Sequence, residues 1–343
     1  MHCAQSVHTM KSRILALIAA LPLLWGWPAH AAELNYHVAD RQSLPGNARW
    51  DYLTFDGASG RLFITRGDHV DVFDAALRRI VGSIDGTAGV HGVALAPAMN
   101  KGFTSNGDGK TVTVFELSSL KVLATIPVQN SPDSIAYDPF SKRIFTSNGD
   151  AGSLTAIDAT TNAVISTVEI GGSLEFMAVD GKGKLYVNLE EKNGVAVIDT
   201  DKLAVLARHD ISAGCNEPTG LAIDAATDRL FAVCRNQKML AISGSTGEIL
   251  ATVGIGKGCD AIAFDKTSNK VFASNGEGTL SVVSADTYKV EQTARTKPTA
   301  RTLALDAAGH RIFTVAADPE GVPASGARPK MKPGSMVLLT VSQ

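Results

Sequence analysis

The sequence predicts an all-β protein, a seven-bladed β-propeller with four-stranded blades whose ring is closed by the N-terminal strand. Three observations predict this fold. One pattern occurs seven times at a spacing of 40 to 44 residues, and the last copy lacks a strand that the segment before the first copy can supply. Every copy also contains the alternating apolar residues that mark strands. A period of about forty residues is typical of propellers, because each blade needs four strands.

The repeat keeps its register residue by residue. Its copies begin at Trp50, Val90, Pro132, Leu174, Pro218, Cys259 and Ala300. In each copy a small residue stands between two apolar ones, and these small residues are Thr54, Ala94, Ala136, Ala178, Ala222, Ala263 and Ala304. Alternation with a period of two predicts a strand. Small side chains at its centre indicate the innermost strand, where the blades converge on the axis.

Each inner strand is followed by a turn and by three further strands. In the third copy the turn is 138–142, the second strand is 143–147, and two more strands cover 153–158 and 163–168. The seventh copy offers only three strands. The stretch from Tyr36 to Leu44 can supply the fourth, so we expect the ring to close by joining its two ends. Closure of this kind removes the exposed sheet edges of an open array.

The N-terminus has the features of a secretory signal peptide. Lys11 and Arg13 precede an apolar run over 14–27, and an Ala-His-Ala sequence ends at residue 31. We therefore predict a signal peptide over 1–31 and a single propeller domain over 32–343, in a periplasmic or secreted protein. The apolar run is too short for a membrane span, so none is expected after cleavage. An uncleaved N-terminal anchor is the alternative.

The charge balance does not favour nucleic-acid binding. The chain has 32 basic and 34 acidic residues, a net charge of −2, and cleavage after residue 31 would remove two basic residues and no acids. Proteins that bind nucleic acid need a basic surface to neutralise phosphates. The expected partner is therefore a small-molecule ligand or a partner protein at the channel mouth.

Three cysteines follow the predicted signal peptide: Cys215, Cys234 and Cys259. An oxidising compartment permits one disulfide among them. Pairing of the first two strands of blade five brings Cys234 near Thr219, so Cys215 to Cys234 is the preferred pair. Cys259 begins the next copy at the same mouth and could replace Cys215, which leaves the connectivity open.

Several phrases of the repeat resemble a known family. Residues 145–148 followed by 155–158, and 186–188 followed by 195–199, resemble the YVTN repeat of the YncE-like β-propeller family. The Pro- and Gly-rich stretch 326–335 resembles an insertion common in the last blade of those proteins. The resemblance covers the whole mature chain and implies the propeller fold. It does not fix a function, because the same repeat serves binding proteins, subunits of redox enzymes and lactonase-like relatives.

Six of the seven residues that begin the inner strands are ionisable. An inner strand starts at one face of the disc, so its first residue points at the mouth of the central channel. Around the ring these residues are Asp51, His91, Asp133, Glu175, Thr219, Asp260 and Arg301. A polar, water-filled channel would explain them without a function, but the set as a whole favours a binding site.

Three of these residues stand on adjacent blades and could hold a metal ion. His91, Asp133 and Glu175 offer an imidazole and two carboxylates, a donor set that binds divalent cations with open positions. They are the candidate metal ligands and the candidate catalytic residues, with His91 as a base or a ligand. A divalent metal ion is the one cofactor that the residues indicate. Their spacing is set by the length of the blade and is not itself a metal signature.

The candidate ligand-binding residues include three others of this ring. Arg301 lies between Asp260 and, across the ring closure, Asp51. Its guanidinium could bind a carboxylate or phosphate of a ligand through two parallel hydrogen bonds. The alternative is an arginine that only neutralises its two neighbours.

A second ring of candidates lies at the ends of the second strands. Its ligand-binding candidates are Arg66, Asn106 and Asn148, with Cys234 and Asn275 at equivalent places. The asparagines precede glycines and are good turn formers, so turn chemistry is the alternative. The longest insertion, 317–335, joins two strands of the last blade and would lie over the mouth. Loops of this length are usually functional or disordered.

The sequence favours a periplasmic propeller that binds a small ligand at the channel mouth, as a sensor, carrier or scaffold. The alternative is a metal-assisted hydrolase or lyase of the lactonase-like kind, which would use the same acidic funnel for hydrolysis or proton abstraction. The chain has no nucleophile elbow, phosphate loop, zinc signature or haem-attachment motif. No local motif therefore names a reaction.

Overall fold

A computed structural model of the protein describes residues 1–2, 5, 34–321 and 329–343. The chain divides into two units, Met1–Glu33 and Leu34–Gln343, and the fold is that of the second. Apart from residues 1, 2 and 5, the predicted signal peptide lies outside the described residues. Within the described ranges, no helix is both long and apolar enough to cross a membrane.

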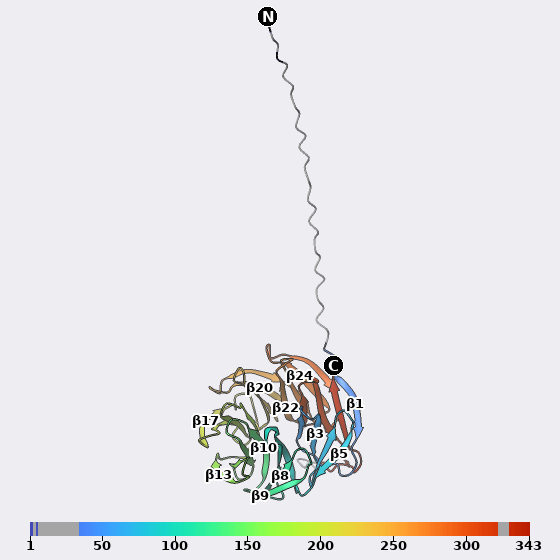
Figure 1. The fold of residues 1–343 in the computed structure, drawn as a ribbon, viewed down its shortest axis with the longest axis vertical. Helices are drawn as coiled ribbons and strands as arrows, with labels where there is room; N and C mark the ends of the chain where they lie inside the picture. The colour runs from blue at the N-terminus through green and yellow to red at the C-terminus, as the bar shows by residue number, and fades with distance from the viewer. Residues whose placement is uncertain (3–4, 6–33, 322–328) are drawn as a thin grey trace. The chain divides into compact units, whose positions relative to one another are not determined.

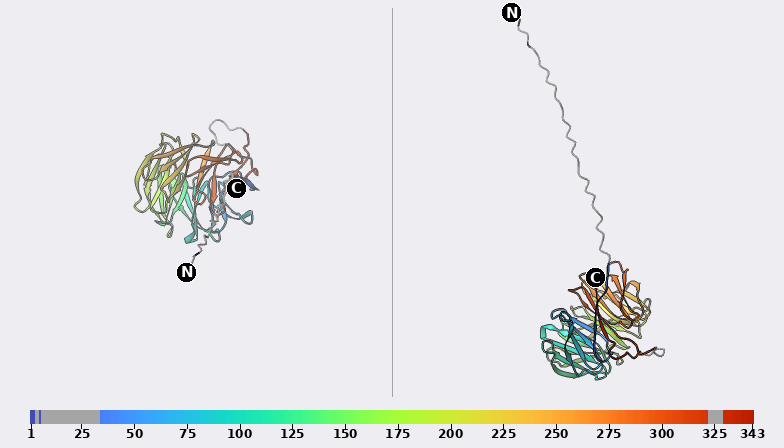
Figure 2. Two further views of the ribbon diagram at one scale, coloured as in Figure 1. Left: turned by 90° about the horizontal axis from the view of Figure 1, so that it is seen from above. Right: turned by 90° about the vertical axis from the view of Figure 1, so that its right-hand side faces the viewer.

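Seven antiparallel sheets of four strands each form a ring, which confirms the predicted seven-bladed β-propeller. The ribbon colour of the propeller passes once round this ring, from blue through green and yellow to red (Figures 1 and 2). A single short 3-10 helix, Pro97–Met99, interrupts the strands of the described chain.

The first four blades follow one another along the chain. Blade 1 contains β2 (Leu53–Asp56), β3 (Arg61–Thr65), β4 (Val70–Asp74) and β5 (Arg79–Ile84). Blade 2 contains β6 (Val90–Ala96), β7 (Lys101–Asn106), β8 (Thr111–Glu116) and β9 (Val122–Pro127). Blade 3 contains β10 (Pro132–Asp138), β11 (Arg143–Asn148), β12 (Ser153–Asp158) and β13 (Val164–Glu169). Blade 4 contains β14 (Leu174–Val179), β15 (Lys184–Leu189), β16 (Gly194–Asp199) and β17 (Ala204–Asp210).

The last three blades complete the ring. Blade 5 contains β18 (Pro218–Asp224), β19 (Arg229–Cys234), β20 (Lys238–Ser243) and β21 (Ile249–Gly254). Blade 6 contains β22 (Cys259–Asp265), β23 (Lys270–Asn275), β24 (Thr279–Ser284) and β25 (Val290–Arg295). Blade 7 contains β26 (Leu303–Asp306), β27 (Arg311–Ala316), β28 (Val337–Ser342) and the N-terminal β1 (His37–Ser43).

The ring closes as predicted, with the N-terminal strand as the outer strand of the last blade. β1 pairs antiparallel with β28, and the register runs from His37 opposite Ser342 to Ser43 opposite Val337. Figure 1 shows blue β1 beside the red C-terminal strands. Blade 7 is therefore built from both ends of the propeller, which makes blade 1 the neighbour of blade 7.

The core consists of apolar layers between neighbouring blades. The third residue of every second strand is a fully buried aromatic: Phe63, Phe103, Phe145, Tyr186, Phe231, Phe272 and Phe313. Each packs in a cluster with buried residues of the next blade, as Phe145 of blade 3 does with Leu174 and Met177 of blade 4. Burying a side chain of this size contributes about 1.5–3 kcal/mol. Because the layers repeat round the ring, the inner-strand starts are held in a rigid circle.

Candidate functional site

The residues predicted at the mouth lie where the inner strands begin. In five blades the pairing of the inner strand with its neighbour is irregular at this point, between Val90 and Gly92 in blade 2 for example. His91, Asp133, Glu175, Thr219 and Asp260 fall within these irregular steps. A bulge bends a strand and turns its side chain away from the regular face. The direction of the mouth side chains is therefore set by the local backbone geometry as well as by the position of each blade in the ring.

Polar side chains of the preceding blade hold the backbone at four ring positions. The hydroxyl of Thr302 donates to the carbonyl of Asp51 at 2.8 Å, and the hydroxyl of Ser105 donates to the carbonyl of Asp133. The hydroxyl of Ser274 donates to the carbonyl of Arg301 at 2.6 Å. The side-chain amide of Asn188 donates to the carbonyl of Thr219 at 2.8 Å. Each bond crosses a blade boundary. The mouth is consequently preorganised, since its backbone is fixed before any ligand arrives.

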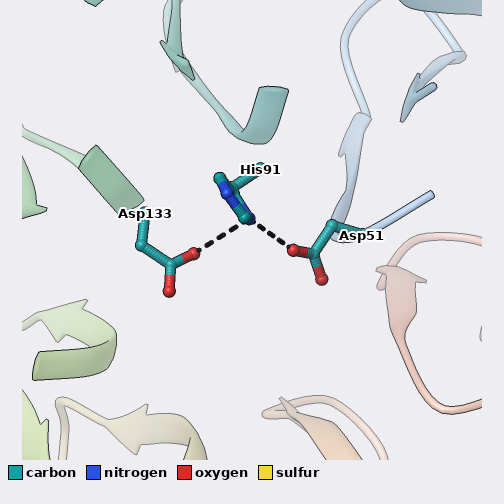
Figure 3. A group of neighbouring side chains, drawn as sticks. All are labelled: Asp51, His91 and Asp133. Atoms are coloured by element: carbon teal, nitrogen blue, oxygen red, sulfur yellow. Dashed lines mark hydrogen bonds and ion pairs between the residues drawn. The ribbon is translucent and has the colours of Figure 1, made fainter. Parts of the chain in front are cut away.

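Figure 3 shows a cluster of Asp51, His91 and Asp133, with both carboxylates turned toward the imidazole. Nδ1 of His91 lies 2.6 Å from Oδ2 of Asp51 and 3.4 Å from Oδ1 of Asp133. The side chains are 14%, 27% and 24% exposed, in the order Asp51, His91, Asp133. They are thus partly desolvated but can be reached from the mouth.

Gly107 makes room for this imidazole. A Cβ atom at position 107 would lie 2.8 Å from Nε2 of His91, closer than real Cβ atoms approach other heavy atoms. Only glycine fits here while the imidazole keeps its place. The Asn-Gly pair at 106–107, which the sequence presented as a turn former, therefore also seats a side chain of the mouth.

Arg301 is bound to both neighbouring acids and is closer to one of them. Its Nε donates to Oδ2 of Asp260 at 2.8 Å, whereas its Nη2 lies 3.5 Å from Oδ1 of Asp51. The guanidinium also lies over the ring of Trp50, 5.5 Å from the ring centre. Burial alone would lower the pKa of Arg301, but the carboxylates of Asp260 and Asp51 raise it overall. Arg301 therefore stays positively charged and is the cation of the ring of inner-strand starts.

Glu175 contacts Glu190 and does not join His91 and Asp133 in the candidate metal site that the sequence predicted. The described residues that could hold a metal together, with ligand atoms within 4.8 Å of one another, are Asp51, His91 and Asp133. Glu175 instead has a side-chain hydrogen bond with Glu190. Burial, followed by the charges of Asp133, Glu190 and Asp260, raises the pKa of Glu175 to about 9. Glu175 is thus protonated at neutral pH.

Glu190 is in turn held by Arg235, a residue that sequence reasoning did not single out. Nη2 of Arg235 lies 2.6 Å from Oε1 of Glu190, and its Nε lies 3.0 Å from Oε2 of Glu217. Arg235 is thus the counter-ion of Glu190, and the raised pKa of Glu175 places a proton on Glu175. These residues follow the second strands of blades 4 and 5, so their loops reach over the mouth.

Two aromatic rings meet beneath the charged residues. Tyr52 of blade 1 and Phe176 of blade 4 are in edge-to-face contact, with ring centres 4.8 Å apart. Blades 1 and 4 are not neighbours in the ring, so this contact spans the central axis. Burial, with the nearby charges of Asp260 and Asp133, raises the pKa of Tyr52 well above its usual value. The contact places two large rings across the central channel, so the mouth is a bowl rather than an open pore.

A cavity of about 1010 Å³ lies at this mouth. Five of the predicted ring residues line it, namely Asp51, His91, Thr219, Asp260 and Arg301. Asp133 and Glu175 are not among its lining residues. The cavity therefore extends over blades 5, 6, 7, 1 and 2.

The insertion over 317–335 contributes one wall of this cavity, as its predicted place over the mouth requires. Glu320, Lys330 and Met331 line the cavity. The two ends of the insertion pair with each other, since the N–H of Glu320 donates to the carbonyl of Lys330 at 2.8 Å. Its middle part, 322–328, lies outside the described residues.

The residues predicted at the ends of the second strands, Arg66, Asn106 and Asn148, are buried and form hydrogen bonds inside the protein. Arg66 is 1% exposed, and its guanidinium donates to Asp71 and to the carbonyls of Pro45 and Asn47. Asn106 and Asn148 are fully buried, and the amide of Asn148 donates to the hydroxyls of Ser153 and Thr155 in its own blade (both 3.0 Å). Arg66 lines the cavity, but the two asparagines do not. The two asparagines therefore hydrogen-bond within their own blades and do not line the cavity.

The disulfide between Cys215 and Cys234 is present, as the preferred pairing predicted. It ties the loop before blade 5 to the end of the second strand, with Cα atoms 5.4 Å apart. Cys259 is a free, buried thiol, and burial raises its pKa well above the usual value. The alternative pairing through Cys259 is therefore not adopted.

The comparisons with known proteins identify the fold. No protein-family model and no curated protein matches the chain. Among solved structures, the chain is similar to hydrazine synthase of Kuenenia stuttgartiensis, with a TM-score of 0.70 and 14% identity over 80% of this chain and 94% of that chain. It is also similar to the WD40 repeats of RRP9, with a TM-score of 0.74 and 11% identity over 89% of this chain and 98% of that chain. At such identities the likeness shows the propeller fold alone, and membership of the YncE-like family stays a prediction.

Sequence reasoning missed the aromatic contact across the axis, although a signal for it was present. The residue after each ring position is Gly92, Ser134, Gly220, Ala261 or Thr302 in five blades, and an aromatic, Tyr52 or Phe176, in the other two. Large side chains at a place that is otherwise small point to a contact across the axis. Glu190 and Arg235 had no comparable signal, because they lie in loops outside the repeated pattern.

Proposed function

We propose that the protein is an exported β-propeller that binds a small polar ligand in the bowl at the mouth of its central channel. The observation that carries this proposal is the cavity of about 1010 Å³, bounded by the charged ring residues and the last-blade insertion. Sites for small molecules are concave and usually have volumes of about 300–1,000 Å³. Export is proposed from the signal-peptide pattern over 1–31.

The lining supports a polar ligand with groups of both charges. Arg301 and Asp260 keep 25% and 23% of their side chains exposed, so both can contact a molecule in the cavity. Lys330 and Arg235 add positive charge to the wall, and Asp51 adds negative charge. Charged groups held in a partly desolvated bowl interact more strongly with a ligand than they would in water. A ligand with both anionic and hydrogen-donating groups would match this lining.

A cavity-blocking substitution tests this proposal. Ala88 is exposed and lines the cavity, so Ala88→Trp should obstruct part of it without disturbing the core. Ala76→Trp is the matched control, because Ala76 is exposed in the turn between β4 and β5, away from the lining residues. The probes are the molecules that native mass spectrometry finds bound to the exported wild-type protein. We expect Ala88→Trp to weaken their binding at least tenfold and Ala76→Trp to leave it unchanged. Equal binding by both variants would place the ligand elsewhere.

Metal-assisted hydrolysis or lyase chemistry is a second candidate function, favoured by the cluster of Asp51, His91 and Asp133. A carboxylate 2.6 Å from an imidazole nitrogen orients that ring, as a general base requires. Turnover of a lactone that is lost on His91→Gln and on chelation would support this candidate. Turnover that both treatments leave intact would reject it.

A further inference from the structure

We propose that Asp51, His91 and Asp133 bind one divalent transition-metal ion, with Zn²⁺ as the best-fitting ion, at the edge of the cavity. The proposal goes beyond ligand binding in the bowl and does not depend on it. It also differs from the metal set that the sequence indicated, because Asp51 replaces Glu175. The cluster lies where blades 1, 2 and 3 meet the mouth.

The geometry of the cluster already suits a metal. Zinc binds His nitrogen and carboxylate oxygen at about 2.0–2.2 Å, so two ligand atoms at the tetrahedral angle lie about 3.4 Å apart. Nδ1 of His91 and Oδ1 of Asp133 are separated by 3.4 Å. The 2.6 Å between Nδ1 and Oδ2 of Asp51 must lengthen by less than 1 Å, which a small rotation of the Asp51 carboxylate achieves.

The charges around the cluster favour a cation. The ring of inner-strand starts contains the carboxyls of Asp51, Asp133, Glu175 and Asp260 and one guanidinium, that of Arg301. Arg301 lies closer to Asp260, at 2.8 Å, than to Asp51, at 3.5 Å. The side of the mouth formed by blades 1 to 3 therefore has an excess of negative charge, which a divalent ion would neutralise.

The cluster is also held in place from outside, as metal ligands usually are. Thr302 and Ser105 donate to the backbone carbonyls of Asp51 and Asp133. The N–H of Tyr52 donates to the carbonyl of His91 at 3.0 Å, and Gly107 leaves the space in which the imidazole sits. The three ligand residues therefore lose little further conformational freedom when an ion binds.

The donor set selects the class of ion. Mg²⁺ and Ca²⁺ prefer oxygen ligands, whereas an imidazole together with carboxylates suits zinc and its first-row neighbours. Three protein ligands leave one tetrahedral position open. Asp51 and His91 line the cavity, so the open position would face the space that a ligand can enter.

The competing explanation is that a protonated His91 serves as the counter-ion of the two aspartates. Both explanations account for an imidazole between two carboxylates, but only ours predicts stoichiometric metal binding. The explanation with Glu175 as a ligand makes a third prediction, namely that binding depends on Glu175. A single set of variants separates the three.

The test is a Zn²⁺ titration of the exported full chain without an affinity tag, stripped with chelator and followed by calorimetry. The variants Asp133→Asn and His91→Gln each remove one proposed ligand. Glu175→Gln is the matched control, because it makes a similar change to a carboxyl of the adjacent blade. A thermal melt of each variant checks that it is folded, and Ca²⁺ is titrated in parallel.

We expect one Zn²⁺ per chain in the wild type and in Glu175→Gln, with no comparable binding of Ca²⁺. Asp133→Asn and His91→Gln should bind Zn²⁺ at least 100-fold more weakly, which exceeds the roughly 10–100-fold cost of losing a supporting partner. Absence of stoichiometric binding in the wild type would overturn the proposal. So would folded ligand variants that bind normally, or a Glu175→Gln variant that loses binding as Asp133→Asn does. None of these outcomes bears on the Ala88→Trp experiment, since no small ligand is present.

Discussion

Replacement of Glu175 by glutamine should stabilise the folded protein at neutral pH, by an amount that depends on pH. Burial and the neighbouring carboxylates raise the pKa of Glu175 from 4.5 to about 9. In the unfolded chain the same carboxyl has an ordinary pKa and loses its proton above about pH 4.3. Between these values the folded state binds one more proton than the unfolded state, so the stability of the wild type falls as pH rises.

The magnitude follows from the same two pKa values. The contribution of Glu175 to stability is fully present below about pH 4.5 and is lost at about 1.4 kcal/mol per pH unit up to the folded pKa. At pH 7 the loss reaches about 3 kcal/mol, an upper figure because the side chain is not fully enclosed and water screens its interactions. Glutamine stays neutral and can still donate to Glu190. We therefore expect Glu175→Gln to be more stable by about 1–3 kcal/mol at pH 7.

The assay is urea denaturation of wild type and Glu175→Gln at pH 5, 6, 7 and 8 in buffer with chelator. The difference in unfolding free energy should stay below about 1 kcal/mol at pH 5 and widen at each step. Glu169→Gln is the control, because Glu169 is exposed at the end of β13. A difference that is the same at pH 5 and pH 8, or a Glu175→Gln variant that is less stable at pH 8, would refute the reasoning.

Two further predictions concern export and the disulfide. The protein recovered from the periplasm should begin at Ala32, since cleavage is expected after Ala31; N-terminal sequencing checks this, and a chain that retains Met1 would contradict it. Replacing Cys215 and Cys234 together by serine should lower the unfolding free energy by about 3 kcal/mol, because the disulfide spans 19 residues and restricts the unfolded chain. An unchanged urea midpoint relative to the oxidised wild type would show that this constraint contributes nothing.

The fold could be predicted because the same strand pattern recurs in the sequence of every blade. A small residue between two apolar ones recurs seven times, and only a ring of equivalent strands satisfies all copies at once. The missing strand of the last copy identified β1 as its outer strand, and the pairing of β1 with β28 confirms this. Because the pattern occurs seven times, a strand that is hard to assign in one copy can be located by alignment with the other six.

The side-chain contacts of the mouth could be predicted only in part. The repeat locates the start of every inner strand, so it brings His91 and Asp133 to adjacent positions and gives Arg301 its two acidic neighbours. It does not give the direction of each side chain, because the irregular steps turn them individually. This is why Asp51 joins His91 while Glu175 turns to Glu190, a loop residue.

Asp51 joins the two halves of the mouth, because its two carboxylate oxygens face different partners. Oδ2 lies 2.6 Å from Nδ1 of His91, and Oδ1 lies 3.5 Å from Nη2 of Arg301. A cation bound with His91 and Asp133 would neutralise much of the charge of Asp51, leaving the guanidinium to Asp260 and to any anionic group in the cavity. Metal binding and ligand binding would then be linked, each favouring the other. Ring closure makes this linkage possible, because only closure makes blade 1 the neighbour of blade 7.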